Sequence, residues 1–437
     1  MMATNILQLM FSAADSIVVG RFAGEAQLAA VGAVVPLISL LTNLFLGLSV
    51  GANVTAARDF GSEDEDGLSK TLHTALLLGL IVGLFLTGFG LALSERFLVL
   101  MQTPDDVLPH AVVYLRIYFL GMASMTIYNF GSAVLRAVGD TSRPLIFLII
   151  SGVINVILNL LFVIAFRWGV AGVAISTILT QTLSAVLLII CLARETGGLR
   201  FSLRKLRLRG EKVRSIVKIG LPAGLQSSMY SVSNVMIQSA INSFGRTVMA
   251  ANTAAVNFED MTYFTLNAVM QSVTSFTGQN MGRGDLERVK KVQIVGQKVV
   301  LTTGITMTVI ISFLAPNLIG IYNSNPDVIT YGVERLRILM PLYFLCGVME
   351  VFIGGMQGMG RSLLPAIVSL VGICAARVSF LTFIFPLEQF HKVTLVYALY
   401  PATWIVTSLA EGICFAVVYR HFKNHRRNHD SVKEIRD

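Results

Sequence analysis

One acidic residue, Asp15, lies inside an apolar segment that is long enough to enter a lipid bilayer. The segment runs over residues 5–23. A carboxylate at the centre of a membrane helix costs about 2.5–3.5 kcal/mol even on the insertion scale most lenient to charge. Such a side chain must face protein or water, and by default it marks the path of an ion or a proton. We therefore expect Asp15 to bind the cation that drives a transport reaction.

Polar side chains from two other segments are expected at the depth of Asp15. Counted at 1.5 Å per residue, Asp15 lies about 10 Å from the outer end of its helix, and Asn159 lies at a similar depth. Asn155 and Asn159 are four residues apart and so share one helix face. Thr177 lies about 11–13 Å into the next helix. These four residues predict a cation or proton site, although polar residues of this kind also join helices in bilayers.

The composition is typical of a protein that crosses the membrane many times. Of 437 residues, 54% are hydrophobic and 14% are charged, against about 25% charged in soluble domains. The length allows about a dozen spanning helices. The sequence thus predicts an all-α integral membrane protein with twelve transmembrane helices, over residues 3–22, 27–57, 69–93, 110–138, 144–166, 168–193, 216–244, 247–279, 292–315, 330–358, 363–386 and 393–420.

The basic residues indicate the orientation in the membrane. With the N-terminus inside, 25 of the 34 Lys and Arg residues fall on the inner side, as cytoplasmic loops require. We therefore expect a multi-pass protein of the cell (inner) membrane with both termini in the cytoplasm. The net charge of +9 then reports topology, and no nucleic-acid partner is expected. The first apolar stretch is too long for the apolar core of a cleavable signal peptide.

The chain contains an internal repeat. Gly61 and Gly282 are 221 residues apart, and so are Pro144 and Pro365. Each half holds an even number of predicted helices, which makes the repeat parallel, with an axis along the membrane normal. We predict an N-terminal six-helix lobe over 1–193, a basic cytoplasmic linker over 194–218, a C-terminal six-helix lobe over 219–420 and a cytoplasmic tail over 421–437. Rocking of two such lobes gives alternating access.

Three sequence motifs resemble signatures of the multidrug and toxin extrusion (MATE) family, in its bacterial-type branch. They are AADSIVVGRFAG at 13–24, LRAVGDTSRP at 135–144 and TGQNMGRGD at 277–285. The resemblance covers essentially the whole chain. It implies an antiporter that expels organic, often cationic, compounds in exchange for H⁺ or Na⁺, with no other cofactor.

The resemblance also points to the residues around Asp15. The family pattern has an acid in the first helix, Asn-x-x-x-Asp in the fifth and Thr in the sixth. Here Asn159 replaces the second acid. Na⁺ is a hard cation that favours carboxylate oxygen, whereas burial of a lone carboxyl favours its neutral, protonated form. We therefore expect coupling to H⁺ rather than to Na⁺.

The second lobe has different chemistry, because the repeat counterpart of Asp15 is Met236. Arg377 is expected near the membrane midplane, where it needs a partner, and Glu350 is the candidate for a structural ion pair. Glu259 could attract a cationic substrate to the cavity or be the exposed end of a kink. Soft and polar side chains suit a cavity that accepts varied ligands, and the candidates are Tyr230, Gln238, Asn257, Glu259 and Met261.

Other functions are less consistent with these residues. An integral-membrane transferase needs a cluster of catalytic His or acidic residues at one interface, and none is evident, so we expect no enzyme. A flippase for lipid-linked precursors or polysaccharide needs a strongly cationic cavity. The four cysteines form neither a CxxC motif nor a cluster with histidine, so no metal site is expected. We expect a monomer whose partners are small-molecule substrates and membrane lipids.

Overall fold

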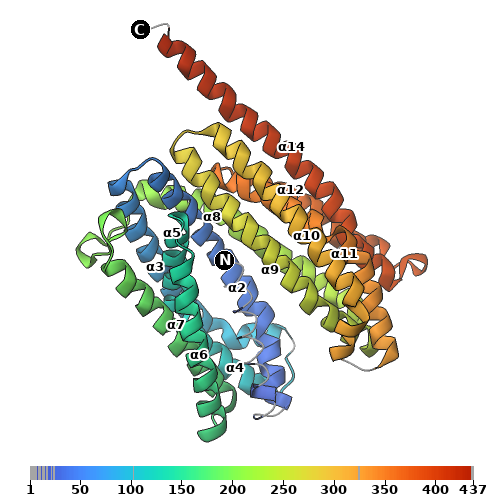
Figure 1. Cartoon of the computed structure of the whole chain (residues 1–437). Helices are drawn as coiled ribbons and strands as arrows, with labels where there is room; N and C mark the ends of the chain where they lie inside the picture. The colour runs from blue at the N-terminus through green and yellow to red at the C-terminus, as the bar shows by residue number, and fades with distance from the viewer. Residues whose placement is uncertain are drawn as a thin grey trace. The chain divides into compact units, whose positions relative to one another are not determined.

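The structure is a computed structural model that describes Leu7, Phe11, Asp15, 18–20, Phe22, 25–101, 103–322 and 325–434. Over these residues the regular secondary structure is helical, without a strand. The chain divides into two compact units, Ala3–Gly224 and Leu225–Asp437. Figure 1 labels their helices.

The first unit contains most of the helices predicted for the first half of the sequence. The predicted segment 3–22 lies largely outside the described residues, but its described positions are helical. The helices that follow are α2 (Glu25–Gly61), α3 (Glu65–Leu100), α4 (Leu108–Leu120), α5 (Met122–Ala137), α6 (Ser142–Leu160) with the π-helical segment η1 (Leu161–Ala165), α7 (Gly169–Ala193) and the first part of α8 (Gly210–Asn242).

The predicted helix over 110–138 is divided at Gly121 into α4 and α5, which are bent by 47°. Two glycines of α3 allow this bent pair to approach closely. A Cβ at Gly90 would lie 2.0 Å from the ring of Phe119, and one at Gly83 would lie 2.5 Å from Cα of Ala123. Side chains at either position would push the pair away, because packed interiors do not tolerate added atoms.

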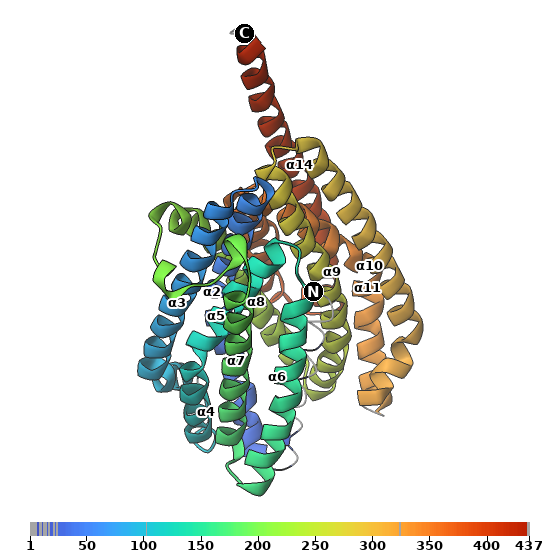
Figure 2. The ribbon, with the colours of Figure 1, turned by 60° about the vertical axis from the view of Figure 1, so that its left-hand side comes forward.

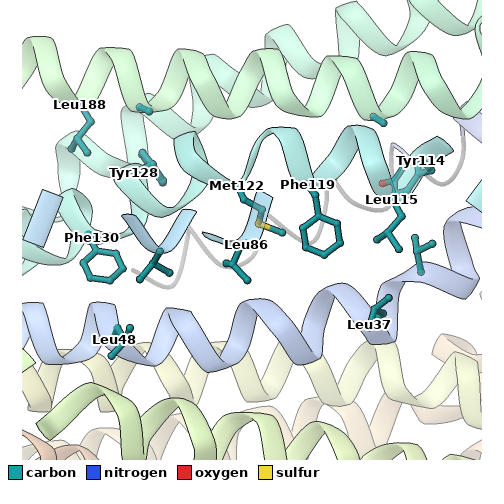
Figure 3. Packing of buried hydrophobic residues seen from close by; sticks show 14 of the residues in the cluster. Leu37, Leu48, Leu86, Tyr114, Leu115, Phe119, Met122, Tyr128, Phe130 and Leu188 are labelled. Carbon is teal, nitrogen blue, oxygen red and sulfur yellow. The ribbon is translucent and has the colours of Figure 1, made fainter. Parts of the chain in front are cut away.

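Apolar side chains from α2, α3, α4, α5 and α7 fill the interior of the first unit, as Figure 3 shows. Burial of such side chains stabilises by about 1.5–3 kcal/mol each in water; in a bilayer the gain comes chiefly from close packing. Figure 2 shows α6 beside α7. The labelled core residues are Leu37, Leu48, Leu86, Tyr114, Leu115, Phe119, Met122, Tyr128, Phe130 and Leu188.

The basic linker over 194–218 lies against the ends of α2 and α3, within the first unit. The backbone N–H of Ser202 donates to Nε2 of the buried His73 at 3.0 Å. Lys212 Nζ lies 2.7 Å from both carboxylate oxygens of Asp59. These contacts hold the linker in one place; it contains the short turns η2 (Gly197–Leu199) and η3 (Leu203–Lys205) and, from Gly210, the beginning of α8.

Helix α8 packs backbone to backbone on α2. A Cβ at Gly47 would lie 2.1 Å from the backbone N of Gly224, and one at Gly51 would lie 2.1 Å from the carbonyl oxygen of Ile216. Small residues permit such close approach of membrane helices. The first part of α8 therefore belongs to the first unit, and the chain enters the second unit at Leu225, inside the helix.

The second unit contains the rest of α8, then α9 (Arg246–Gly282), α10 (Leu286–Tyr322), α11 (Pro326–Gly358), α12 (Leu363–Ser369), α13 (Ala376–Ser379) and α14 (Val393–Glu434). The predicted helix over 363–386 is divided by two π-helical segments, η4 (Leu370–Ala375) and η5 (Phe380–Ile384), and the turn η6 (Glu388–Phe390) follows. Helix α14 continues through most of the predicted tail.

The helix bounds repeat with the period predicted from the sequence. Helices α3 and α10 begin 221 residues apart, at Glu65 and Leu286, and α6 and α12 begin 221 residues apart as well. The turns repeat too: Glu63 and Gly284, which are also separated by this spacing, both have positive φ, 60° and 71°. The two units are therefore built on the same helical plan.

Eight helices of the described chain are long and apolar enough to cross a membrane, or nine if the bent pair α4–α5 counts as one span. Helices α8 and α9 coincide with the predicted segments 216–244 and 247–279 but are not among these. The reason is their many Ser, Thr, Asn and Gln residues, which make them less apolar than their length alone suggests.

Candidate functional site

Asp15 and Asn159 are in direct contact. The side-chain amide of Asn159 donates a hydrogen bond to Oδ1 of Asp15. The same amide nitrogen lies 3.2 Å from Oδ1 of Asn155, one turn earlier on α6. Both asparagines are buried. The structure thus brings together the acid and the two amides that the sequence places at one depth.

The ring of Phe11 lies against α6 at a glycine. A Cβ at Gly152 would lie 1.8 Å from the ring of Phe11. Phe11 lies one turn before Asp15, and Gly152 lies two turns before Asn159. The π-helical segment η1 begins two residues after Asn159, and wide turns of this kind are frequent at functional sites.

Helix α7 completes the polar layer with two hydroxyl groups. Ser176 Oγ donates to Oδ1 of Asn159, and Thr180 Oγ1 lies 3.4 Å from Nδ2 of Asn155. Both residues are buried. They are four residues apart, so one face of α7 faces the two asparagines of α6.

Thr177 has no hydrogen bond to this layer among the residues that the structure describes. Its hydroxyl donates to the backbone oxygen of Val173 at 2.9 Å, as Thr often does within a helix. Ser176 and Thr180, rather than Thr177, supply the hydroxyl groups that contact the two asparagines. Their spacing of four residues, matched to that of Asn155 and Asn159, is the sequence signal that could have identified them.

Two tyrosines of α4 lie near the acid. Asp15 is close enough to interact electrostatically with the hydroxyl groups of Tyr114 and Tyr118. Their rings are stacked with centroids 6.2 Å apart. The described hydrogen-bond partner of Asp15 is neutral, so a proton or a small cation is the species that can neutralise it without a change in the protein.

The second unit contains a buried ion pair, whereas the polar layer of the first unit contains an acid beside neutral groups. Arg335 donates from Nε and Nη2 to the two carboxylate oxygens of Glu259, at 2.6 and 2.7 Å. Both side chains are buried, and the guanidinium lies 5.2 Å from the ring centroids of Tyr397 and Tyr400. The expectation that Glu259 attracts a cationic substrate stays a prediction, and it is weakened because Arg335 already neutralises the charge of Glu259 in this structure.

The expected ion pair between Glu350 and Arg377 is wrong as well. Arg377 Nε donates to Thr403 Oγ1 at 3.1 Å, and its guanidinium lies 4.3 Å from the ring centroid of Tyr400. Glu350 has Asn267 as its hydrogen-bond partner, at 3.5 Å. The aromatic face and the hydroxyl satisfy Arg377, so a carboxylate is not needed.

The other residues expected in a substrate cavity stay predictions. Gln238 of α8 is joined to Asn252 of α9 by a hydrogen bond of 2.8 Å. Asn257 donates to a backbone oxygen of its own helix, and Met261 is exposed. The hydroxyl of Tyr230 lies 3.4 Å from the side-chain nitrogen of Gln226. Gln238 thus joins α8 to α9, and Tyr230, which also interacts with the hydroxyl of Ser369, joins α8 to α12.

Comparison with known proteins identifies the family. A family model described as MatE matches residues 1–161 and 222–381. The two matched stretches begin 221 residues apart, which is the period of the repeat. The chain belongs to the MatE family. The resemblance seen in the three sequence motifs is thereby confirmed.

Relatives of this MATE protein are transporters. The probable multidrug resistance protein YpnP of Bacillus subtilis (strain 168) is 30% identical over 381 residues, which are 87% of this chain and 85% of that protein. The probable multidrug resistance protein NorM of Thermotoga maritima is 24% identical, over 86% and 82% of the two chains. A FAD transporter of Shewanella oneidensis is also 24% identical, over 84% and 82%. The chain is thus a multi-pass membrane transporter and not an enzyme.

Solved structures of MATE proteins share the fold. A crystal structure of MATE in complex with MaL6 superposes with a TM-score of 0.90 at 22% identity and covers 97% of this chain and 95% of that one. An outward-facing multidrug resistance MATE transporter gives a TM-score of 0.88 at 23% identity, over 97% and 94%. This likeness confirms the predicted fold class, an all-α membrane protein with twelve helices in two lobes.

Proposed function

We propose that this MATE protein is a cation-coupled antiporter that exports small organic compounds and takes its energy from cation entry at Asp15. The contact of Asp15 with Asn159 carries the proposal. A carboxyl group held by a neutral amide changes its charge when it binds a cation, and that change alters the packing of the first segment on α6 and α7. The multidrug resistance names of the relatives support organic compounds as substrates.

H⁺ is the proposed coupling ion. Asp15 is the one acid in a layer whose other described members are Asn155, Asn159, Ser176 and Thr180. A Na⁺ site usually offers more than one negatively charged or carbonyl oxygen, whereas a single desolvated carboxyl needs only a proton to become neutral.

The proposed substrates are amphipathic compounds, cations included. A flippase for lipid-linked precursors is less well supported, because the buried Arg335 and Arg377 are held by Glu259, Thr403 and Tyr400 and are not free to hold a pyrophosphate. The proposed setting is the cell (inner) membrane with both termini in the cytoplasm, and the proposed working form is a monomer with no nucleic-acid partner. The uneven distribution of Lys and Arg supports this orientation.

The central experiment measures substrate-driven H⁺ flux in proteoliposomes. Ethidium is the cationic probe, and FAD is tested beside it as an anionic one. We expect Asp15→Asn to reduce ethidium-driven H⁺ flux to that of vesicles without protein. Asp105→Asn, in an exposed turn, is the matched control and should retain wild-type flux. Wild-type flux in Asp15→Asn would refute the coupling role of Asp15.

Asn159→Asp tests the choice of ion. It places a second carboxyl beside Asp15 and so creates the oxygen set that favours Na⁺. We expect the rate of the wild-type protein to be independent of Na⁺ at fixed pH and the rate of the variant to rise with Na⁺. A wild-type rate that already requires Na⁺ would contradict the H⁺ proposal.

A further inference from the structure

A second buried acid, Glu411 of α14, has no role in the proposal above. Its side chain is fully buried, and Oε1 accepts a hydrogen bond from Ser369 Oγ at 3.0 Å. Oε2 has no hydrogen-bond partner in the described part of the chain. Thr407, one turn earlier on α14, is also fully buried, and its hydroxyl has no described partner either. A carboxyl oxygen and a hydroxyl thus lie unpaired in the interior of the second unit.

A short chain of hydrogen bonds leads to Glu411 from α8. Gln226 Nε2 donates to Ser369 Oγ at 2.8 Å, and Ser369 Oγ donates in turn to Glu411. The same Gln226 nitrogen lies 3.4 Å from the hydroxyl of Tyr230. Every described group that reaches Glu411 through this chain is neutral.

The titratable groups that face Glu411 do not include a paired cation. Glu350, from α11, is close enough to interact with Glu411 electrostatically, and Cys414 on α14 does so as well. Arg377 turns its guanidinium toward Thr403 and Tyr400, and Thr403 lies about 12 Å from Glu411 along α14. No described Lys or Arg forms an ion pair with Glu411.

A negative charge at this position would be costly. Transfer of an isolated carboxylate to a protein interior costs several kcal/mol even after relaxation, and the nearby carboxyl of Glu350 adds repulsion if both are ionised. We propose that Glu411 carries a proton and that it is a second proton-binding site of the transporter, located within the second unit and independent of Asp15.

The structure also indicates what release of this proton would move. Ser369 is the last residue of α12, and the π-helical segment η4 follows it directly. A Cβ at Gly372, inside η4, would lie 2.4 Å from Thr407 Oγ1. Helix α14 therefore contacts this region at two points. Glu411 accepts a hydrogen bond from Ser369, just before η4, and Thr407 packs against Gly372, inside η4.

Loss of the proton from Oε2 of Glu411 to water leaves a carboxylate with two strong acceptor oxygens. The hydroxyl groups of Ser369 and Thr407 are the nearby donors of hydrogen bonds to this carboxylate. Because Ser369 and Gly372 lie on either side of the start of η4, a change in these hydrogen bonds acts on the turn. π-Helical turns have an altered hydrogen-bond pattern and are frequent at functional sites, which suits a segment that responds to protonation.

Infrared difference spectroscopy on the purified protein in lipid tests the site directly. A protonated carboxyl group has its own carbonyl-stretching band, separate from that of a carboxylate. We expect a band that is present in the wild type and in Asp15→Asn, absent in Glu411→Gln, and lost from the wild type as the pH is raised. Glu388→Gln, in the exposed turn η6, is the matched control and should keep it.

Two results would overturn the proposal. One is a wild-type band pattern in Glu411→Gln, which means that Glu411 is ionised or does not titrate. The other is a Glu411 band that persists at every pH at which the protein stays folded, which means a permanently neutral structural acid. If Glu411→Gln fails to fold, Ser369→Ala replaces it: loss of the hydrogen bond must shift the band, and an unshifted band refutes the assignment. Failure here leaves the Asp15 proposal intact, because Asp15→Asn is measured separately.

Discussion

The two units share their helix bounds but not their polar centres. In the first unit, Asp15 meets the neutral amide of Asn159. At the 221-residue spacing these positions become Met236 and Phe380 in the second unit. The second unit has its ion pair elsewhere, between Glu259 and Arg335.

The reverse comparison gives the same result. The positions that correspond to Glu259 and Arg335 in the first unit are Ile38 and Tyr114. Duplication has therefore preserved the backbone plan while each unit acquired its own buried charges. The scaffold thus accommodates buried polar groups at different positions in the two units, and function must be assigned from the groups themselves.

The largest effect on stability is expected when the buried ion pair between Glu259 and Arg335 loses its arginine. Arg335→Met leaves Glu259 buried without a partner, which costs about 3–5 kcal/mol. Thermal unfolding in detergent should show a large fall in Tm, and coupling through Asp15 should persist in the protein that remains folded. The double variant Glu259→Gln with Arg335→Met should recover most of the loss. If Arg335→Met is as stable as the wild type, the pair does not hold the second unit together.

A smaller effect is expected where the first segment meets α6. Gly152→Ala places a methyl group where the ring of Phe11 lies, 1.8 Å away. Overpacking of this kind costs about 1–3 kcal/mol, and displacement of Phe11 also moves Asp15, one turn further along. We expect lower H⁺ flux per transporter in proteoliposomes. Gly32→Ala is the control, because its methyl group would meet open space, and equal losses in both variants would argue against the contact.

The smallest effect is expected from a comparison of two adjacent hydroxyl residues on α7, Ser176 and Thr177. Ser176→Ala removes the donor to Asn159, and a hydrogen bond contributes about 1 kcal/mol net, or roughly a fivefold change in an equilibrium constant. Thr177→Val removes a hydroxyl that bonds only to its own helix. We expect the apparent H⁺ affinity for transport to change in Ser176→Ala and not in Thr177→Val. A larger change in apparent H⁺ affinity in Thr177→Val than in Ser176→Ala would indicate that Thr177 belongs to the site.

The sequence predicts the helices and the repeat well, because both depend on local patterns. Apolar runs locate the helices, and Gly61 and Gly282 end α2 and α9 as the repeat requires. The break at Gly121 was not predicted, because the apolar pattern continues across it. The bend depends on the fit of Phe119 against Gly90, and Gly90 belongs to another helix.

The polar site is predicted in part. Asn155 and Asn159 lie on one face by their spacing alone, and the structure keeps them together. Ser176 was missed, although its spacing from Thr180 matches that of Asn155 and Asn159, because hydroxyl residues are frequent in membrane helices and often only join them. The ion pair of Arg335 was not predicted, because its partner Glu259 lies 76 residues away on another helix. Contacts of this kind depend on tertiary structure.

Helix α8 is the route by which the chain leaves the first unit, and this has a consequence for engineering. Its first half is locked to α2 at Gly47 and Gly51, while its second half lies in the next unit. An extra residue after Gly224 would turn everything beyond it by about 100° around the helix axis. An extra residue in the preceding segment, near the exposed Leu203, would leave the helical register of α8 unchanged. Tags and spacers should therefore be placed there.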